Sequence, residues 1–249
     1  MLNRHIALLD ILVRERHPLT TIELAHLLGF PVSTTYRLVS QLQQGHLLVR
    51  RGDGRYWLSL KLLSYGGSVI DYLNLRDVAL PYMRELCQEA GETVFLTVAD
   101  TDAGVFIEKV ESSVHTLRVH LEIGRREPLF AGASMKILLA HLPQSQQRAV
   151  IERAKGYRLA RGVRLDPIKL TEELERIRSN GWAASQEEMN DGEAGVSAAI
   201  RGRDGAVVAG LTISGAAVRF TPKRVLKLAR LVLTAAERVS RDLGGALPT

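Results

Sequence analysis

Residues 20–58 constrain the fold of this chain more than any other stretch, because they combine two short helices, a tight turn and a basic hairpin. Thr20 and Glu23 have the spacing of a capping box, in which each side chain satisfies an unpaired amide at a helix start. Gly29 suits the left-handed turn that ends this helix, and Pro31 suits the start of the next. The pattern predicts a helix-turn-helix unit.

The second helix of this unit, predicted over residues 32–44, has one apolar and one polar face. Four residues follow the i, i+3, i+4, i+7 spacing of a buried stripe: Thr35, Leu38, Val39 and Leu42. The opposite face is left to Ser33, Thr34, Tyr36, Arg37 and Gln41. A short helix with an exposed polar face after a tight turn is typical of a DNA recognition helix.

A basic hairpin is predicted directly after this helix. Two strand-like runs, over residues 47–49 and 56–60, flank a Gly-Asp-Gly turn. Three arginines lie at the tip: Arg50, Arg51 and Arg55. Helices and hairpin together have the pattern of a winged helix-turn-helix, in which one helix enters the major groove of double-stranded DNA and the wing meets phosphate.

The rest of the first 65 residues supports the same prediction. A further helix is expected near the N-terminus, where apolar residues recur at spacings of four, three and four: Leu2, Ile6, Leu9 and Val13. This helix should pack against the other two and complete a three-helix core. Residues 1–65 hold eight lysines and arginines against four acidic residues, whereas residues 66–249 hold 25 against 23. This basic head favours contact with phosphate, although the charge alone is also compatible with an ordinary protein surface.

The length and composition limit the class of protein. A chain of 249 residues is long enough for two domains with separate cores. It has no run of about 18 apolar residues, so no transmembrane helix is expected. The N-terminus has the pattern of an amphipathic helix and not of a signal sequence, and the single cysteine, Cys87, excludes an internal disulfide. We expect a cytoplasmic protein with Cys87 as a core thiol.

The clearest break in composition is Tyr65-Gly66-Gly67-Ser68, which sets the expected domain boundary. It separates a DNA-binding domain, residues 1–65, from a helical region, residues 66–90, in which Pro81 interrupts the apolar period. We interpret that region as a bent linker or as two helices, and its apolar residues favour pairing between subunits. Residues 91–249 form the last domain.

The last domain is predicted to be α+β, because the apolar period changes from 3.6 to 2 after Gly91. Strands are expected over residues 93–98, 105–110, 117–121, 196–200 and 206–214. Helices are expected from about residue 133 to 142, over 144–154, over 171–178 with Thr171 as the cap, and from Pro222 onwards. Antiparallel strands with helices packed on one sheet give this fold class.

Several short motifs are distributed along nearly the whole chain. The first domain contains Ser33-Thr34-Thr35-Tyr36-Arg37-Leu38 and Tyr56-Trp57-Leu58. The second contains Gly91-Glu92-Thr93, Pro128-Leu129, Lys136, Gly181-Trp182, Gly195-Val196 and Ile213-Ser214-Gly215. In content and order they resemble the isocitrate-lyase-regulator (IclR) family of bacterial transcription regulators. The resemblance implies a winged DNA-binding domain, a linker helix that dimerises and a GAF-like domain that binds a small organic acid.

The resemblance also implies roles for particular residues. The expected DNA contacts are Ser33, Thr34, Tyr36 and Arg37 in the recognition helix and Arg50, Arg51 and Arg55 in the wing. The expected effector contacts are Ala133 and Ser134 at a helix start, an acidic residue, Ala198, Thr212 and Ser214. Glu188 is the first choice for the acidic residue and Asp191 the second. Phe130, Met135 and Arg201 depart from the family pattern, and the first two are expected to border the pocket.

Physical arguments leave alternatives open at these positions. A loop of small residues that leads into a helix presents free N–H groups to a carboxylate, and Thr212 and Ser214 share one face of a strand. Pattern alone favours a plain helix cap at Ala133 and Ser134 and ordinary strand residues at Thr212 and Ser214, and only the resemblance reverses that order. A catalytic Ser134–Lys136 pair is disfavoured, because residues two apart on a helix point to different sides. No cofactor is expected. A metal shared by His115 and His120 is disfavoured, because residues five apart on or beside a strand lie on opposite faces.

The sequence therefore favours a transcriptional regulator, more specifically a repressor, over an enzyme. We expect a homodimer that binds a near-palindromic operator, with operator affinity set by a small carboxylate effector. A tetramer of two dimers is also compatible with the sequence. The alternative is a DNA-binding regulator whose second domain only dimerises and binds no ligand. A hydrolase that uses Ser134 and Lys136 is a third and weaker hypothesis.

Overall fold

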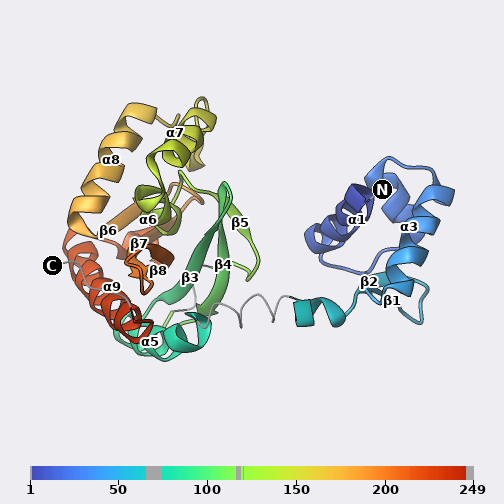
Figure 1. The fold of residues 1–249 in the computed structure, drawn as a ribbon, viewed down its shortest axis with the longest axis horizontal. Coiled ribbons are helices and arrows are strands. Elements are labelled where there is room, and N and C mark those ends of the chain that lie inside the picture. The colour runs from blue at the N-terminus through green and yellow to red at the C-terminus, as the bar shows by residue number, and fades with distance from the viewer. Residues whose placement is uncertain (1, 66–74, 116–118, 120, 245–249) are drawn as a thin grey trace. The chain divides into compact units, whose positions relative to one another are not determined.

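The computed structural model describes residues 2–65, 75–115, 119 and 121–244 (Figure 1). The chain divides into two compact units, Met1–Tyr72 and Leu73–Thr249, which we call the N-terminal and C-terminal units. Among the described residues, no helix has the length and apolar character needed to cross a membrane.

The N-terminal unit contains three helices and a two-stranded hairpin: α1 (Leu2–Glu15), α2 (Thr21–Leu28), α3 (Val32–Gln44), β1 (Leu48–Arg50) and β2 (Tyr56–Leu58). The predicted capping box is present, since Glu23 N–H donates to Thr20 Oγ1 (3.2 Å) and Thr20 N–H donates to Glu23 Oε2 (2.7 Å). Gly29 has φ 66° and ends α2 in the left-handed conformation. These local signals fix the turn between the two helices as predicted.

The core of the N-terminal unit confirms the buried stripe of α3 and corrects that of α1. Thr35, Leu38, Val39 and Leu42 are all buried. In α1 the buried residues are Leu8, Ile11 and Leu12, whereas Leu2, Ile6 and Val13 are exposed. Helix α1 carries two overlapping apolar stripes, and packing against α2 and α3 selects the one that was not predicted.

The C-terminal unit is built on a six-stranded antiparallel sheet in the order β5-β4-β3-β8-β7-β6. Its strands are β3 (Thr93–Asp100), β4 (Ala103–Val110), β5 (Arg126–Pro128), β6 (Trp182–Gln186), β7 (Glu193–Arg201) and β8 (Val207–Ala216). Its helices are α5 (Leu75–Ala90), α6 (Ala133–His141), α7 (Gln144–Arg153), α8 (Pro167–Asn180) and α9 (Pro222–Asp242), with short turns η1 (Ala160–Gly162) and η2 (Ala217–Arg219).

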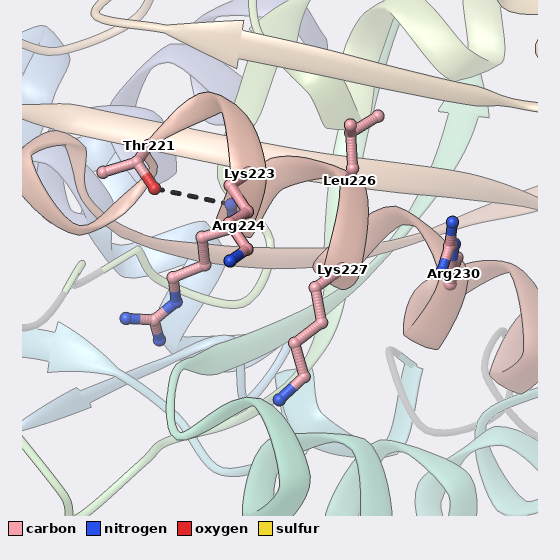
Figure 2. Close-up of a pocket in the computed structure, with 6 residues that line it drawn as sticks. All are labelled: Thr221, Lys223, Arg224, Leu226, Lys227 and Arg230. Carbon is pink, nitrogen blue, oxygen red and sulfur yellow. Dashed lines mark hydrogen bonds between the residues drawn. The ribbon is translucent and has the colours of Figure 1, made fainter.

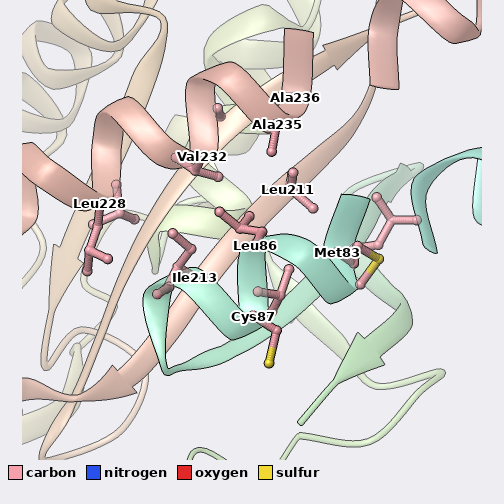
Figure 3. Packing of buried hydrophobic residues seen from close by; sticks show 14 of the residues in the cluster. Met83, Leu86, Cys87, Leu211, Ile213, Leu228, Val232, Ala235 and Ala236 are labelled. Atoms are coloured by element: carbon pink, nitrogen blue, oxygen red, sulfur yellow. The ribbon is translucent and has the colours of Figure 1, made fainter. Parts of the chain in front are cut away.

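Each face of the sheet packs on helices, and each carries its own core. Helices α5 and α9 cover one face, where Met83, Leu86 and Cys87 meet Leu211 and Ile213 (Figure 3). Cys87 is the buried thiol that the sequence predicted, and burial raises its pKa, with a smaller contribution from Glu92. Helix α6 covers the other face, with α8 packed on it. The α+β prediction is confirmed.

Several element boundaries differ from prediction for identifiable reasons. Helix α5 continues through Pro81 as one helix and packs on α9 and β3, so residues 75–90 belong to the C-terminal unit. Helix α8 begins at Pro167 and is capped by Asp166, whose side chain accepts from Ile168 N–H (2.9 Å), and Thr171 lies inside the helix. Strands β5 and β6 were not predicted. The predicted domain break at residues 66–68 and most of the predicted strand at 117–121 lie outside the described residues.

Candidate functional site

The polar face of α3 is exposed to solvent, as its periodicity predicted. Ser33 and Arg37 are exposed, Thr34 is half-buried, and Tyr36 is 62% exposed although its side chain is a large aromatic group. The opposite face of the helix is held in the core, so these four side chains cannot turn inward. The arrangement presents an arginine, a phenol and two hydroxyls on one rigid surface.

The three arginines of the wing have two different environments. Arg50 and Arg51 are exposed beside the turn. Arg55 points back to the helices, where Nη1 donates to Glu23 Oε2 (2.9 Å) and to the Pro18 carbonyl (3.1 Å). Residue Leu19 adds a β-bridge to Tyr56, with N–H to carbonyl distances of 3.1 and 2.7 Å. Arg55 therefore fixes the base of the wing, and Arg50 and Arg51 supply its outward charge.

Glu23 joins the helix cap to the wing. The hydrogen bond from the Thr20 backbone is the main reason that the pKa of the Glu23 carboxyl lies below its ordinary value, and Arg55 adds to the effect. The carboxylate thus stays charged, as both the capping box and the ion pair with Arg55 require. Its position shows that one acidic residue orients both parts of the winged unit.

The C-terminal unit contains a small cavity of about 10 Å³ between the sheet and the start of α6. The apolar part of its wall comes from Phe95, Phe106, Leu121, Ala133 and Met189. The polar part comes from Ser134, Ser185, Glu193, Thr212 and Ser214, with Gly195 between them. Apolar walls with a few convergent polar groups are typical of small-molecule sites.

Strand pairing brings the polar groups of the sheet together. Ser214 lies opposite Thr93 on β3 and opposite Gly195 on β7. Its hydroxyl lies 3.0 Å from both Glu193 Oε1 and the Ala194 carbonyl. The Thr93 hydroxyl beside it is buried and is without a hydrogen-bond partner among the described residues. A buried hydroxyl with no partner is costly, and Thr93 is not among the residues that line the cavity.

The start of α6 is partly satisfied from within the chain. Gly132 N–H donates to Glu188 Oε2 and Ala133 N–H donates to Ser185 Oγ, both at 2.9 Å. Within the described part of the chain, neither the N–H nor the hydroxyl of Ser134 forms a hydrogen bond, and Ser134 lines the cavity. Ser134 thus keeps two donors for a bound anion at the positive end of the helix.

The structure brings four of the six predicted effector residues to the cavity: Ala133, Ser134, Thr212 and Ser214. Ala198 is not among them. It pairs with Leu211, and both side chains lie in the core under α5 and α9, on the opposite face of the sheet. Glu188 lies at the start of α6 but does not line the cavity, and Asp191 is exposed. The acidic residue in the wall is Glu193, which was not predicted.

Lys136 lies on a different side of α6 from Ser134, as the helical spacing predicted. Its side chain is 1% exposed, and Nζ lies 2.6 Å from both Glu173 Oε1 and Glu188 Oε1. Neither Phe130 nor Met135 lines the cavity, so the expectation that both border it was wrong. Met135 packs against Gly104 of β4, and the ring of Phe130 meets that of Tyr157 edge-on.

The residues of β7 that lie on the same face of the sheet as Thr212 and Ser214 were not predicted from the sequence. Glu193, Gly195 and Ser197 alternate along β7 and pair with Ala216, Ser214 and Thr212. Thr212 Oγ1 donates to Ser197 Oγ at 2.9 Å, so Ser197 is the β7 residue that lies where Ala198 was expected. The pairing of β7 with β8 decides which face each residue takes, and that register is a long-range property.

A larger and more open hollow lies along the first turns of α9 (Figure 2). The described residues that line it are Thr221, Lys223, Arg224, Leu226, Lys227 and Arg230. Thr221 caps the helix, and Arg224 is bound to Glu92 (3.0 Å) and to the Ala90 carbonyl (3.1 Å). This basic surface lacks the buried hydroxyls that the cavity at α6 offers.

Comparison with known families agrees with both units. Residues 2–52 match the IclR helix-turn-helix domain, and residues 67–241 match the family described as bacterial transcriptional regulator IclR C-terminal. The chain belongs to the IclR family. It is a transcriptional regulator with a helix-turn-helix DNA-binding domain, and the IclR relatives found are named as regulators and repressors, not as enzymes.

Individual IclR relatives match nearly the full chain. The HTH-type transcriptional regulator KipR of Bacillus subtilis is 35% identical and covers 97% of this chain and 96% of its own. The transcriptional repressor IclR of Escherichia coli is 29% identical, and the match covers 98% of this chain and 90% of the repressor. The crystal structure of Thermotoga maritima IclR is 30% identical with a TM-score of 0.79, over 98% of both chains. The structure of an IclR homologue from Microbacterium hydrocarbonoxydans complexed with 4-hydroxybenzoate is 25% identical with a TM-score of 0.84. The match covers 97% of this chain and 98% of the homologue.

Proposed function

We propose that this regulator is a repressor that binds a near-palindromic operator as a homodimer, and that a small organic acid in the cavity changes its operator affinity. Ser33, Thr34, Tyr36 and Arg37 contact base edges in the major groove. Arg50 and Arg51 contact phosphate. Arg55 does not contact DNA directly but holds the wing in position, because its guanidinium is paired with the Glu23 carboxylate.

The observation that carries the effector part is the pair of free donors on Ser134. A carboxylate at that position accepts from the Ser134 N–H and hydroxyl and meets the positive end of α6. Thr212 and Ser214 then orient the rest of the molecule against the rings of Phe95 and Phe106. The complex of the Microbacterium homologue with 4-hydroxybenzoate, an aromatic carboxylate, supports this class of ligand.

Substitutions in the N-terminal unit test the DNA-binding part. Arg37→Ala should weaken operator binding by about 1–3 kcal/mol and relax base preference, because Arg37 is the long cationic side chain on the exposed face of α3. Arg51→Ala should weaken binding to all duplexes alike and reduce the slope of log K against log salt by about one. Gel-shift or anisotropy titrations over a range of salt concentrations, on a genomically selected operator and a scrambled duplex, measure both effects.

Arg148→Ala is the matched control, since it removes one exposed arginine from the C-terminal unit. It should leave operator affinity and salt slope unchanged. Equal operator affinity in wild type, Arg37→Ala and Arg51→Ala would contradict the assignment of α3 and the wing to DNA.

Small carboxylates test the effector part. A true ligand at about a hundredfold excess over Kd should stabilise the protein by about 2.7 kcal/mol and shift the gel-shift midpoint. Ser134→Ala and Thr212→Val should reduce this response at least tenfold, whereas Ser179→Ala, an exposed position on α8, should not. If no carboxylate in a broad panel stabilises the wild type, the C-terminal unit would act in dimerisation alone.

A further inference from the structure

We infer that the ligand of this cavity carries a hydroxyl or ammonium group in addition to its carboxylate, and that Glu193 receives this group. The inference rests on the proposed function of the cavity and narrows the chemical class of its ligand. Glu193 would then be a specificity-determining residue, which admits hydroxy and amino acids and rejects plain carboxylic acids.

The first observation is that the Glu193 carboxylate lies in the cavity wall and can accept more hydrogen bonds than the protein gives it. Its Oε1 accepts from Ser214 Oγ at 3.0 Å and its Oε2 accepts from Asn190 Nδ2 at 2.5 Å. An ionised carboxylate accepts about four hydrogen bonds, so each oxygen retains one place. These two protein donors orient the carboxylate and leave an acceptor for a donor on the ligand.

The second observation is the charge balance of the cavity. Among the described residues that line it, none is basic, and Glu193 is the acidic one. The nearby cation, Lys136, is committed to Glu173 and Glu188 beside a neighbouring pocket. A plain carboxylic acid would therefore meet the helix start at one end and a like charge at the other. A hydroxyl or ammonium group at the far end replaces that repulsion by a charge-assisted hydrogen bond.

The third observation is the spacing of the two polar ends. A Cβ built on Gly195 would lie 3.6 Å from the Ala133 Cβ, so the start of α6 lies directly over Gly195. Glu193 is two residues away on the same face of β7, a separation of about 7 Å at the rise of a strand. The apolar side chains of Phe95, Phe106, Leu121 and Met189 complete the wall of the cavity.

Matched pairs of probes test the inference on the full-length protein. Propionate is compared with 3-hydroxypropionate and β-alanine, and pentanoate with 5-hydroxypentanoate, by calorimetric titration and thermal shift. In at least one pair the substituted acid should bind the wild type about tenfold or more tightly, as expected for one hydrogen bond to a charged group. In Glu193→Gln this preference should fall to about threefold or less, and the plain acids should bind more tightly than they bind the wild type.

Asp191→Asn is the control, because it removes an equal charge two residues away at an exposed position outside the cavity wall. It should keep the wild-type preference. Equal affinity for both members of every pair in the wild type, or an unchanged preference in Glu193→Gln, would overturn the inference and leave the proposed carboxylate site standing. If none of the five probes binds the wild type, the inference fails together with the proposed site.

Discussion

Replacing Lys136 with methionine should lower the free energy of unfolding of the C-terminal unit by about 3–5 kcal/mol. Lys136 is almost fully buried and lies 2.6 Å from an oxygen of both Glu173 and Glu188, whose side chains are 32% and 20% exposed. Methionine fills a similar volume but leaves two partly buried carboxylates facing each other without a cation. The loss should also loosen the start of α6, because Glu188 accepts from Gly132 N–H as well.

The two tryptophans make this measurement specific, because Trp57 lies in the N-terminal unit and Trp182 in the C-terminal unit. In a Trp57→Phe background, urea unfolding followed by fluorescence reports on Trp182 alone. Adding Glu173→Gln and Glu188→Gln to Lys136→Met should recover at least half of the loss, because both uncompensated charges are gone. A loss below about 1 kcal/mol in Lys136→Met would show that the cluster does not stabilise the fold.

The N-terminal unit was predictable from sequence because its signals are local. The capping box at Thr20, the left-handed Gly29 and the stripe of α3 each depend on residues within one or two turns. The failure in α1 has the same origin. Two stripes on one helix have equal periodicity, and only contacts with α2 and α3 decide that Leu8 and Leu12 are the buried ones.

The cavity was predictable only in part, because its residues come from elements far apart in the chain. Thr212 and Ser214 both line the cavity, because period two within one strand places them on one face. Ala198 was wrong because its face depends on the register between β7 and β8, and a shift of one residue turns every side chain over. Glu193 was missed because no local pattern shows that β7 begins at this residue, or that its side chain meets Ser214 of β8.

Family motifs that had no assigned function receive a structural explanation. Gly91-Glu92-Thr93 and Ile213-Ser214-Gly215 lie side by side, since Thr93 pairs with Ser214 across β3 and β8. Glu92 is 2% exposed, and its carboxylate receives two hydrogen bonds of 2.6 Å from Arg219 and one of 3.0 Å from Arg224. These contacts tie the start of β3 to η2 and to the first turn of α9.

Gly215→Ala should therefore destabilise the C-terminal unit by about 3 kcal/mol. A Cβ at this position would lie 2.3 Å from Glu92 Oε2 and 3.0 Å from the Phe220 ring. The carboxylate cannot move aside without breaking its bonds to two arginines, and Phe220 is itself buried. The backbone of Gly215 does not have a positive φ, so steric contact is the cause of the loss and not backbone strain.

Gly195→Ala on the neighbouring strand is the matched control, because a Cβ there meets its neighbours at ordinary distances of 3.5–3.6 Å. It should cost less than about 1 kcal/mol when both variants are compared by urea unfolding at Trp182. Glu92→Ala should itself be destabilising, since it leaves Arg219 and Arg224 without their shared carboxylate. In that background Gly215→Ala should cost clearly less, because the contact with the Glu92 carboxylate is gone and only that with the Phe220 ring remains. Independent, additive losses in the double variant would refute this coupling and, with it, the explanation of why the two motifs occur together.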